Sequence, residues 1–249
     1  MLSRCNGTRN RPGSNSGARL NLRPRFCFLG GMLHPHCFGG RLGMTVELQM
    51  LLGLFFIISV LAVVFGPIAV SNGIAKMLEK IAFTCGWCLV ILMCVTCFDV
   101  FSRKLGLPIS LTRFQELEWW LHTTIFSSWM GYNYTINAHP RVDSFTENVS
   151  FHSRAWLELI GLLLFALPYI AITCYFGIDF VYQSWRVDEG SESAIGMPHR
   201  WIIKGIYIAG IWLVLLAIIS VLLKVVAYLF GGVPNERANL QIGKSELEV

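Results

Sequence analysis

The stretch QELEWWLHTTIFSSWMGYNYTINAHPRVD, residues 115–143, decides how this chain must be organised. At about 1.5 Å per residue, a helix over this stretch is long enough to cross a bilayer. At about 100° per residue, its polar side chains fall on several sides of the helix. Such a helix is costly among acyl chains, so we expect it to pack against other protein. The polar positions are Glu118, His122, Thr123, Thr124, Ser127, Ser128, Asn133, Thr135 and Asn137.

The composition around this stretch is that of a membrane protein. Of the 249 residues, 54% are hydrophobic and only 14% are charged, and the mean hydropathy is +0.56. Soluble domains rarely place uncharged apolar stretches of about 20 residues one after another. We therefore expect an all-α integral membrane protein whose connections are too short to form an extramembrane domain. The expected spans are 48–70, 81–101, 114–138, 156–182 and 201–230.

Residues 1–43 differ from the rest of the chain. They contain seven arginines, no Lys, Asp or Glu, and no helical period. One interpretation is a disordered basic tail that touches anionic lipid. The preferred interpretation is that the natural chain starts at Met44 and that residues 1–43 are an over-extended translation.

Cysteine and histidine are the candidates for cofactor chemistry. The pairs Cys85/Cys88 and Cys94/Cys97 have a spacing found in metal and redox sites, but on one helix the two pairs point to opposite sides. Thiolates are also disfavoured in hydrocarbon, so we expect structural cysteines. His122 lacks a second histidine at matching depth for haem. We expect no catalytic residue, no metal and no cofactor.

Three further features concern helix packing. Asp99 and Arg103 are spaced to form an i, i+4 pair at the end of a span, and we favour a local structural role over a partner contact or an ion route. Pro168 predicts a kink within its span. Gly205 and Ala209 form a small-xxx-small pattern, which would permit a close helix contact or be ordinary small residues facing lipid.

Four short patterns, in order and at matching spacing, carry a family resemblance. They are DVFSR at 99–103, QELE at 115–118, HPRVD at 139–143, and a Glu-x-Ser … Gly-x-Pro-x-x-Trp-x-x-Lys run over 189–204. Through these patterns the chain, from residue 76 onward, resembles the small membrane subunit (DctQ-like) of tripartite ATP-independent periplasmic (TRAP) transporters. The last run resembles especially the branch assigned to mannitol or chloroaromatic compounds. The resemblance implies partner-interface or fold-fixing roles for Asp99, Arg103, Glu116, His139, Arg141, Asp143, Glu189, Ser191, Pro198, Trp201 and Lys204.

The resemblance also implies a domain layout. Residues 76–231 would form the family's four-helix domain, with both ends cytoplasmic. The expected remainder is the extension 1–43, an additional apolar helix within 44–75, and a polar tail at 232–249. That additional helix has no family counterpart and would place the N-terminus outside. The chain departs from the family pattern at Ala138 and Pro140, where Gly and Val are usual.

The function implied by the resemblance is secondary transport in the bacterial inner membrane. A periplasmic binding protein would deliver an organic solute, and a large permease subunit would move it, usually with sodium. This chain would brace the permease; it would not be an enzyme and would bind no nucleic acid. The alternatives are a membrane anchor of an electron-transfer complex and a solitary membrane protein.

Overall fold

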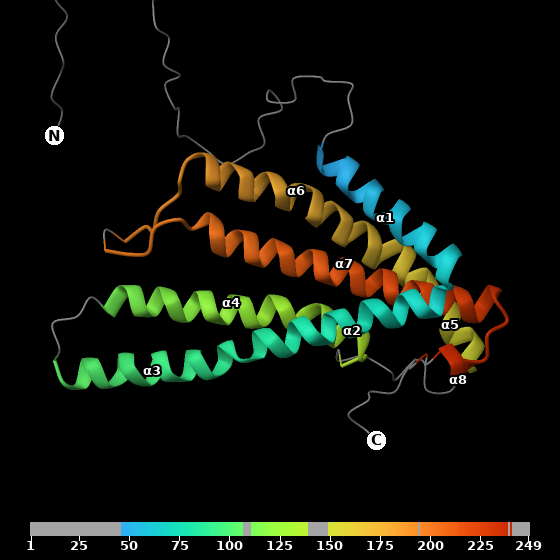
Figure 1. Cartoon of the computed structure of the whole chain (residues 1–249), viewed down its shortest axis with the longest axis horizontal. Helices are drawn as coiled ribbons and strands as arrows, with labels where there is room; N and C mark the ends of the chain where they lie inside the picture. The colour runs from blue at the N-terminus through green and yellow to red at the C-terminus, as the bar shows by residue number, and fades with distance from the viewer. Residues whose placement is uncertain (1–45, 107–110, 139–148, 194, 239, 241–249) are drawn as a thin grey trace, which may run out of the picture. The chain divides into compact units, whose positions relative to one another are not determined.

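The computed structural model describes residues 46–106, 111–138, 149–193, 195–238 and 240, all within one compact unit, Gly43–Val249. These residues form helices and, over the same ranges, no strand, which confirms the predicted all-α class (Figure 1). The helices are α1 (Val46–Phe65), α2 (Pro67–Gly86), α3 (Cys88–Lys104), α4 (Leu111–Thr135), α5 (Phe151–Gly161), α6 (Leu167–Arg186), α7 (Trp201–Phe230) and the short α8 (Asn235–Ala238).

Four helical stretches are long and apolar enough to cross a membrane: α1, α2 with α3, α5 with α6, and α7. Helix α4 is not among them, although its 25 residues would extend about 37 Å. Its polar composition is the reason. Helix α4 instead packs against α7, α3 and α2, as expected for a helix too polar to lie among lipids (Figure 1).

Helix α7 is the centre of the bundle. Half of its most apolar window is buried, against 11% for α1, and it contacts α2, α4, α5 and α6. Leu215 and Ile218 are among the largest side chains that are fully buried. The helix is apolar all around, which is the pattern of a helix surrounded by protein or lipid on every side.

Five serine and threonine hydroxyls of α4 are satisfied by the helix itself. Thr123 donates to the carbonyl oxygen of Trp119 at 2.8 Å, and Ser128 donates to that of Ile125 at 2.9 Å. Thr124, Ser127 and Thr135 make the same kind of bond one turn back. These five side chains therefore do not require a partner protein to satisfy them, a feature that their polarity alone did not predict.

Helices α4 and α7 approach each other closely at Gly210. A Cβ atom at Gly210 would lie 2.7 Å from the carbonyl oxygen of Ser127, and one at Gly131 would lie 2.9 Å from that of Leu213. The pattern at Gly205 and Ala209 does not make this contact, since a Cβ at Gly205 would meet only Val181, at 3.8 Å. Small residues thus bring these helices together, but they are Gly210 and Gly131, not Gly205 and Ala209.

Helix α2 is tied to both of these helices by polar contacts. Ser71 donates to the carbonyl oxygen of Ser220 on α7 at 2.9 Å, and Ser220 returns the bond to the carbonyl of Ser71 at 3.0 Å. The indole N–H of Trp129 on α4 donates to the carbonyl oxygen of Ala82 at 2.9 Å. Hydrogen bonds of this kind hold helices together where water is scarce.

Two helix interruptions have local causes. Gly66, with φ of 89°, makes the turn that Pro67 follows as the first residue of α2, so the apolar run 48–70 is divided at this point. Helix α2 then continues through the expected domain boundary at residue 76. A π-helical turn, Leu162–Ala166, lies between α5 and α6, just before Pro168. Proline has no backbone N–H to donate, and the π-helical turn accommodates this break in the α-helical hydrogen bonds.

Candidate functional site

The residues of the 189–204 pattern come together with Glu116 where α4 and α7 begin. The connection 187–200 between α6 and α7 folds against the first turns of both helices. We call Glu116, Glu189, Ser191, Gly196 and Lys204 the loop cluster. Its members are far apart in sequence, so the structure brings two of the four family patterns into one place.

The carboxylate of Glu116 holds the loop at two points. Its Oε1 accepts a hydrogen bond from the Ser191 hydroxyl, and its Oε2 accepts one from the backbone N–H of Met197. Nearby, the Arg113 guanidinium donates to the carbonyl oxygen of Ile195 at 3.1 Å. The start of α4 therefore binds both the beginning and the end of the loop.

Gly196 is required by this arrangement. A Cβ atom at this position would lie 2.5 Å from Oε1 of Glu116 and closer still to the side chain of Ser191. Even alanine would therefore displace the hydrogen bond between Glu116 and Ser191. This steric reason explains a glycine whose φ angle is not unusual.

Glu189 makes the second half of the loop cluster. Its Oε2 accepts bonds from the Lys204 ammonium and, at 2.6 Å, from the Ser184 hydroxyl, while its backbone oxygen accepts from the Arg200 N–H at 2.8 Å. The Lys204 ammonium also lies 4.3 Å from the centre of the Phe180 ring. The hydrogen bond from Lys204, followed by that from Ser184, lowers the pKa of Glu189 from its ordinary value of 4.5.

The lowered pKa predicts an acid-sensitive contribution to stability. Because the folded state holds Glu189 in its charged form, its contribution is present above pH 4.5 and is lost as the pH falls through the lower, folded pKa. The difference in melting temperature between wild type and Glu189→Gln should therefore narrow on acidification from pH 6 to pH 3.5. Thermal unfolding of both proteins in detergent measures this, and a difference that stays constant across the range contradicts the prediction.

Asp99 and Arg103 form the predicted i, i+4 ion pair, in which Asp99 Oδ2 accepts from the guanidinium. The Asp99 side chain is only 4% exposed and lies in a shallow cavity between α3 and α4 that Glu118 also lines. Among the described residues, Asp99 Oδ1 and Glu118 Oε1 have no hydrogen-bond partner. The pair is thus largely buried on its acidic side, and it is separate from the loop cluster.

The other predicted site residues are less closely connected. Pro198 is exposed in the loop, and Trp201 is the first residue of α7, with its ring centre 6.5 Å from that of His199. His139, Arg141 and Asp143 lie outside the residues that the structure describes. Pro140 also lies outside them, so its effect on the exit from α4 stays a prediction.

Three contributors to the loop cluster were missed from the sequence. Arg113 and Ser184 bind the loop through side chains, and Met197 does so through its backbone N–H. No sequence pattern indicates a backbone donor of this kind. Ser184 could have been suspected, because it lies five residues before Glu189 at the end of α6.

The chemistry available to these groups is structural. Both carboxylates of the loop cluster are occupied by donors from within the chain. Over the described ranges, no three Cys, His, Asp or Glu side chains are placed to hold a metal ion. His122 is exposed on α4.

Comparison with known proteins agrees with this view. The family model of the DctQ component of tripartite ATP-independent periplasmic transporters matches residues 92–227, which contain all four short patterns and the whole loop cluster. Helices α1 and α2 and the first residues of α3 precede the matched region. No curated protein and no solved structure matches the chain. The match covers more than half of the sequence and confirms the resemblance at the level of the family: the chain belongs to the DctQ component family and is the small membrane subunit of a TRAP transporter.

Proposed function

We propose that this subunit braces the large permease subunit of its transporter during uptake of an organic solute. In this proposal a periplasmic binding protein delivers the solute, and the permease moves it, coupled to sodium, across the bacterial inner membrane. The subunit contributes no solute ligand. Its contribution is a rigid multi-pass helical bundle held in the bilayer beside the permease.

The observation that carries this proposal is the convergence of family-pattern residues in the loop cluster. Glu116, Glu189, Ser191 and Lys204 use their polar atoms on one another and on the loop backbone. Residues that satisfied each other in this way would fix the shape of a surface and would leave few groups to bind solute. The hydroxyls of α4 also favour a structural role. They bond to carbonyl oxygens of their own helix and so are not free to bind solute.

We assign the remaining pattern residues to the same task. Asp99 and Arg103 would fix the end of α3, and Pro198 and Trp201 would fix the entry to α7. His139, Arg141 and Asp143 would contact the partner or fix the connection after α4. The 189–204 run, typical of the mannitol or chloroaromatic branch, is the basis for proposing a solute of that class.

The electron-transfer anchor is the weaker alternative, since the family match is to a transporter component. A haem anchor needs two histidines at matching depth. His122 is the one described histidine well inside a helix of membrane length, while His152 bonds Trp156 and His199 bonds Asp188, both near helix ends.

Co-purification tests the bracing role. We expect the tagged chain, extracted in mild detergent, to recover a larger and more hydrophobic permease in fixed ratio, and we expect its deletion to abolish solute uptake. The control for the deletion is the variant Glu192→Gln, which should keep both recovery of the permease and solute uptake. The Glu192 side chain is 94% exposed, so its substitution should leave the bundle intact. Recovery of the tagged chain alone, together with normal uptake in the deletion strain, would falsify the proposal.

A further inference from the structure

Two carboxylates with unpartnered oxygens lie together at the seam between α3 and α4. Asp99 on α3 and Glu118 on α4 line the same cavity, which has a volume of about 570 Å³. Asp99 Oδ1 and Glu118 Oε1 are buried from water and have no hydrogen-bond partner among the described residues. A buried charged oxygen without a donor is costly, so the site requires a donor that the described part of the chain does not supply.

The cations beside the cavity do not fill this role. The Arg103 guanidinium bonds to the other oxygen of Asp99, Oδ2. Lys104 also lines the cavity, but it is exposed and makes no ion pair with the residues that the structure describes. The two carboxylates thus share one guanidinium, and that guanidinium is bonded to Asp99 alone.

The outer side of α3 is open to a neighbouring protein. Within the described ranges, α3 packs against α4 and against the α2 helix that precedes it. Val100, which lines the cavity, is 50% exposed, and the next residue, Phe101, is 66% exposed. Apolar side chains alone would suit lipid equally well, but acyl chains offer no donor to the two carboxylates.

We propose that the cavity receives an arginine side chain of the large permease subunit. A guanidinium carries several N–H donors in a planar fork, so one arginine can bond to carboxylates from two helices at once. It is also more weakly hydrated than an ammonium group, which favours arginine in ion pairs that are buried at an interface. This contact rests on the proposed bracing role, because the permease supplies the arginine, and it attaches both α3 and α4 to one point of the partner.

A metal ion suits the cavity less well. Hard cations such as Ca²⁺ take about six to eight oxygen ligands. The described lining offers two carboxylates and the hydroxyl of Thr96. Over the described ranges, no three Cys, His, Asp or Glu side chains are placed to hold a metal ion. A guanidinium needs no such set, because its donors are engaged by the two carboxylates.

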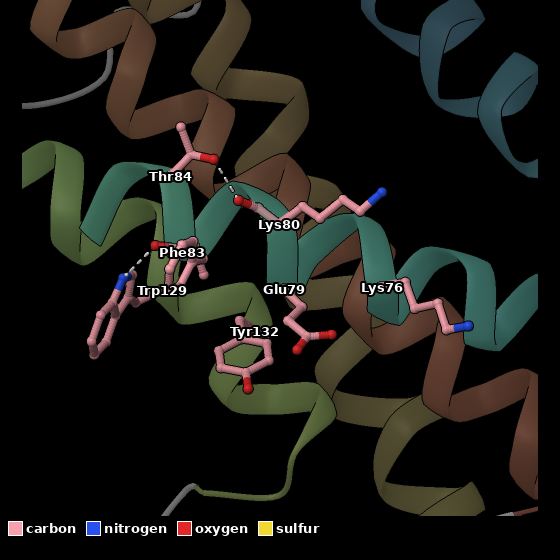
Figure 2. Close-up of a pocket in the computed structure, with 8 residues that line it drawn as sticks. Lys76, Glu79, Lys80, Phe83, Thr84, Trp129 and Tyr132 are labelled. Atoms are coloured by element: carbon pink, nitrogen blue, oxygen red, sulfur yellow. Dashed lines mark hydrogen bonds between the residues drawn. The ribbon is translucent and has the colours of Figure 1, made fainter. Parts of the chain in front are cut away.

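The groove of about 720 Å³ between α2 and α4 provides a contrast. Its charged residues Lys76, Glu79 and Lys80 are all exposed, unlike the unpartnered oxygens of the cavity between α3 and α4. In Figure 2, Glu79 extends toward Tyr132, whereas Lys80 lies on the side of α2 away from Tyr132. These charges do not converge on one point, and Glu79 therefore serves as a control for Glu118.

Glu118→Gln tests the contact in the complete transporter, in which the tagged chain is co-expressed with its permease. The substitution keeps the size of the side chain and removes its charge. We expect the permease to dissociate roughly tenfold faster from the immobilised chain in mild detergent. In the isolated chain the melting temperature should not fall, because an unpartnered charge has been removed. Glu79→Gln makes the same chemical change at an exposed position and should leave dissociation unchanged.

Charge reversal identifies the partner residue. Glu118→Arg should abolish solute uptake, because it sets two guanidinium groups against each other. Second-site suppressors, selected for restored uptake, should replace an arginine of the permease with an acidic or neutral residue. Suppressors that fall only within this chain would overturn the proposal, because they would place the role of Glu118 inside its own fold.

The bracing role and the arginine contact can fail separately. If the wild-type chain does not retain the permease, the bracing role fails and the contact fails with it. If the wild type and Glu118→Gln retain the permease equally well, only the contact is overturned. A lower melting temperature of the isolated Glu118→Gln chain would also overturn it, as would an equal loss of permease in Glu79→Gln, which would reflect net charge alone. Sodium or phosphatidylethanolamine that stabilises the isolated wild type but not Glu118→Gln, with permease retention intact, would assign the cavity to an ion or a headgroup instead.

Discussion

Gly210→Ala is expected to lower the melting temperature of the detergent-solubilised protein by roughly 5–10 °C. The new Cβ would lie 2.7 Å from the carbonyl oxygen and 2.8 Å from the Cα atom of Ser127, both of which belong to the backbone of α4. Backbone within a helix cannot rotate away, so α4 and α7 must separate. Overpacking of this kind costs about 1–3 kcal/mol, and the shift in melting temperature follows from the size of the chain.

Gly205→Ala is the matched control on the same helix. Its Cβ would meet only Cγ1 of Val181, at 3.8 Å, which is an ordinary contact. The substitution raises helix propensity equally in both variants, so the difference between them isolates the crossing with α4. Equal melting temperatures for the two variants, measured by size-exclusion chromatography after heating, would show that α4 and α7 are not closely packed at Gly210.

The same pair of glycines shows what the sequence could predict about packing. The small-xxx-small pattern at Gly205 and Ala209 left open a close contact or ordinary small residues, and the close contact of α7 with α4 is made at Gly210 instead. A helix that is apolar on every side gives no directional signal, so the sequence could not say which side faces α4. The partner residues Ser127 and Gly131 could be recognised only once the two helices were placed together.

The polar helix presents the opposite case. The existence and approximate bounds of this helix followed from the length of the stretch and from the membrane-protein composition of the chain around it. The reason it is tolerated did not follow. Polarity suggested a missing partner, whereas hydroxyls such as Thr124 and Ser128 bond to carbonyl oxygens one turn back. A serine or threonine hydroxyl can bond either to a partner protein or to its own helix, so the sequence alone could not distinguish the two.

The loop cluster was predictable in its members but not in its geometry. Family patterns singled out Glu116, Glu189, Ser191 and Lys204, yet nothing in their spacing joined position 116 to position 191. The resemblance implied only that Glu116 contacts a partner or fixes the fold. Its carboxylate binds the 187–200 loop, since a carboxylate has two oxygens and can hold two donors at once.

Glu116→Gln is therefore expected to release the loop while leaving the bundle folded. Glutamine keeps one acceptor oxygen but replaces the other with an amide N–H₂, which would face either the Met197 N–H or the Ser191 hydroxyl. One donor then loses its partner, and the bond to a charged acceptor becomes a bond to a neutral one. We expect roughly tenfold faster amide hydrogen exchange at residues 195–200, with little change in the core of α7.

The control for Glu116→Gln is Glu192→Gln, which makes the same chemical change at a residue of the 187–200 loop. The Glu192 carboxylate lies 3.4 Å from Arg200 and is almost fully exposed, so its loss should leave exchange at residues 195–200 unchanged. A second comparison uses Gly196→Ala, which should release the loop to a similar extent, because its Cβ occupies the space where Glu116 meets Ser191. If Glu116→Gln and Gly196→Ala each speed exchange and their combination adds little, both act through one contact. Exchange in Glu116→Gln that matches the wild type would mean that the loop is held by Glu189 and Lys204 alone.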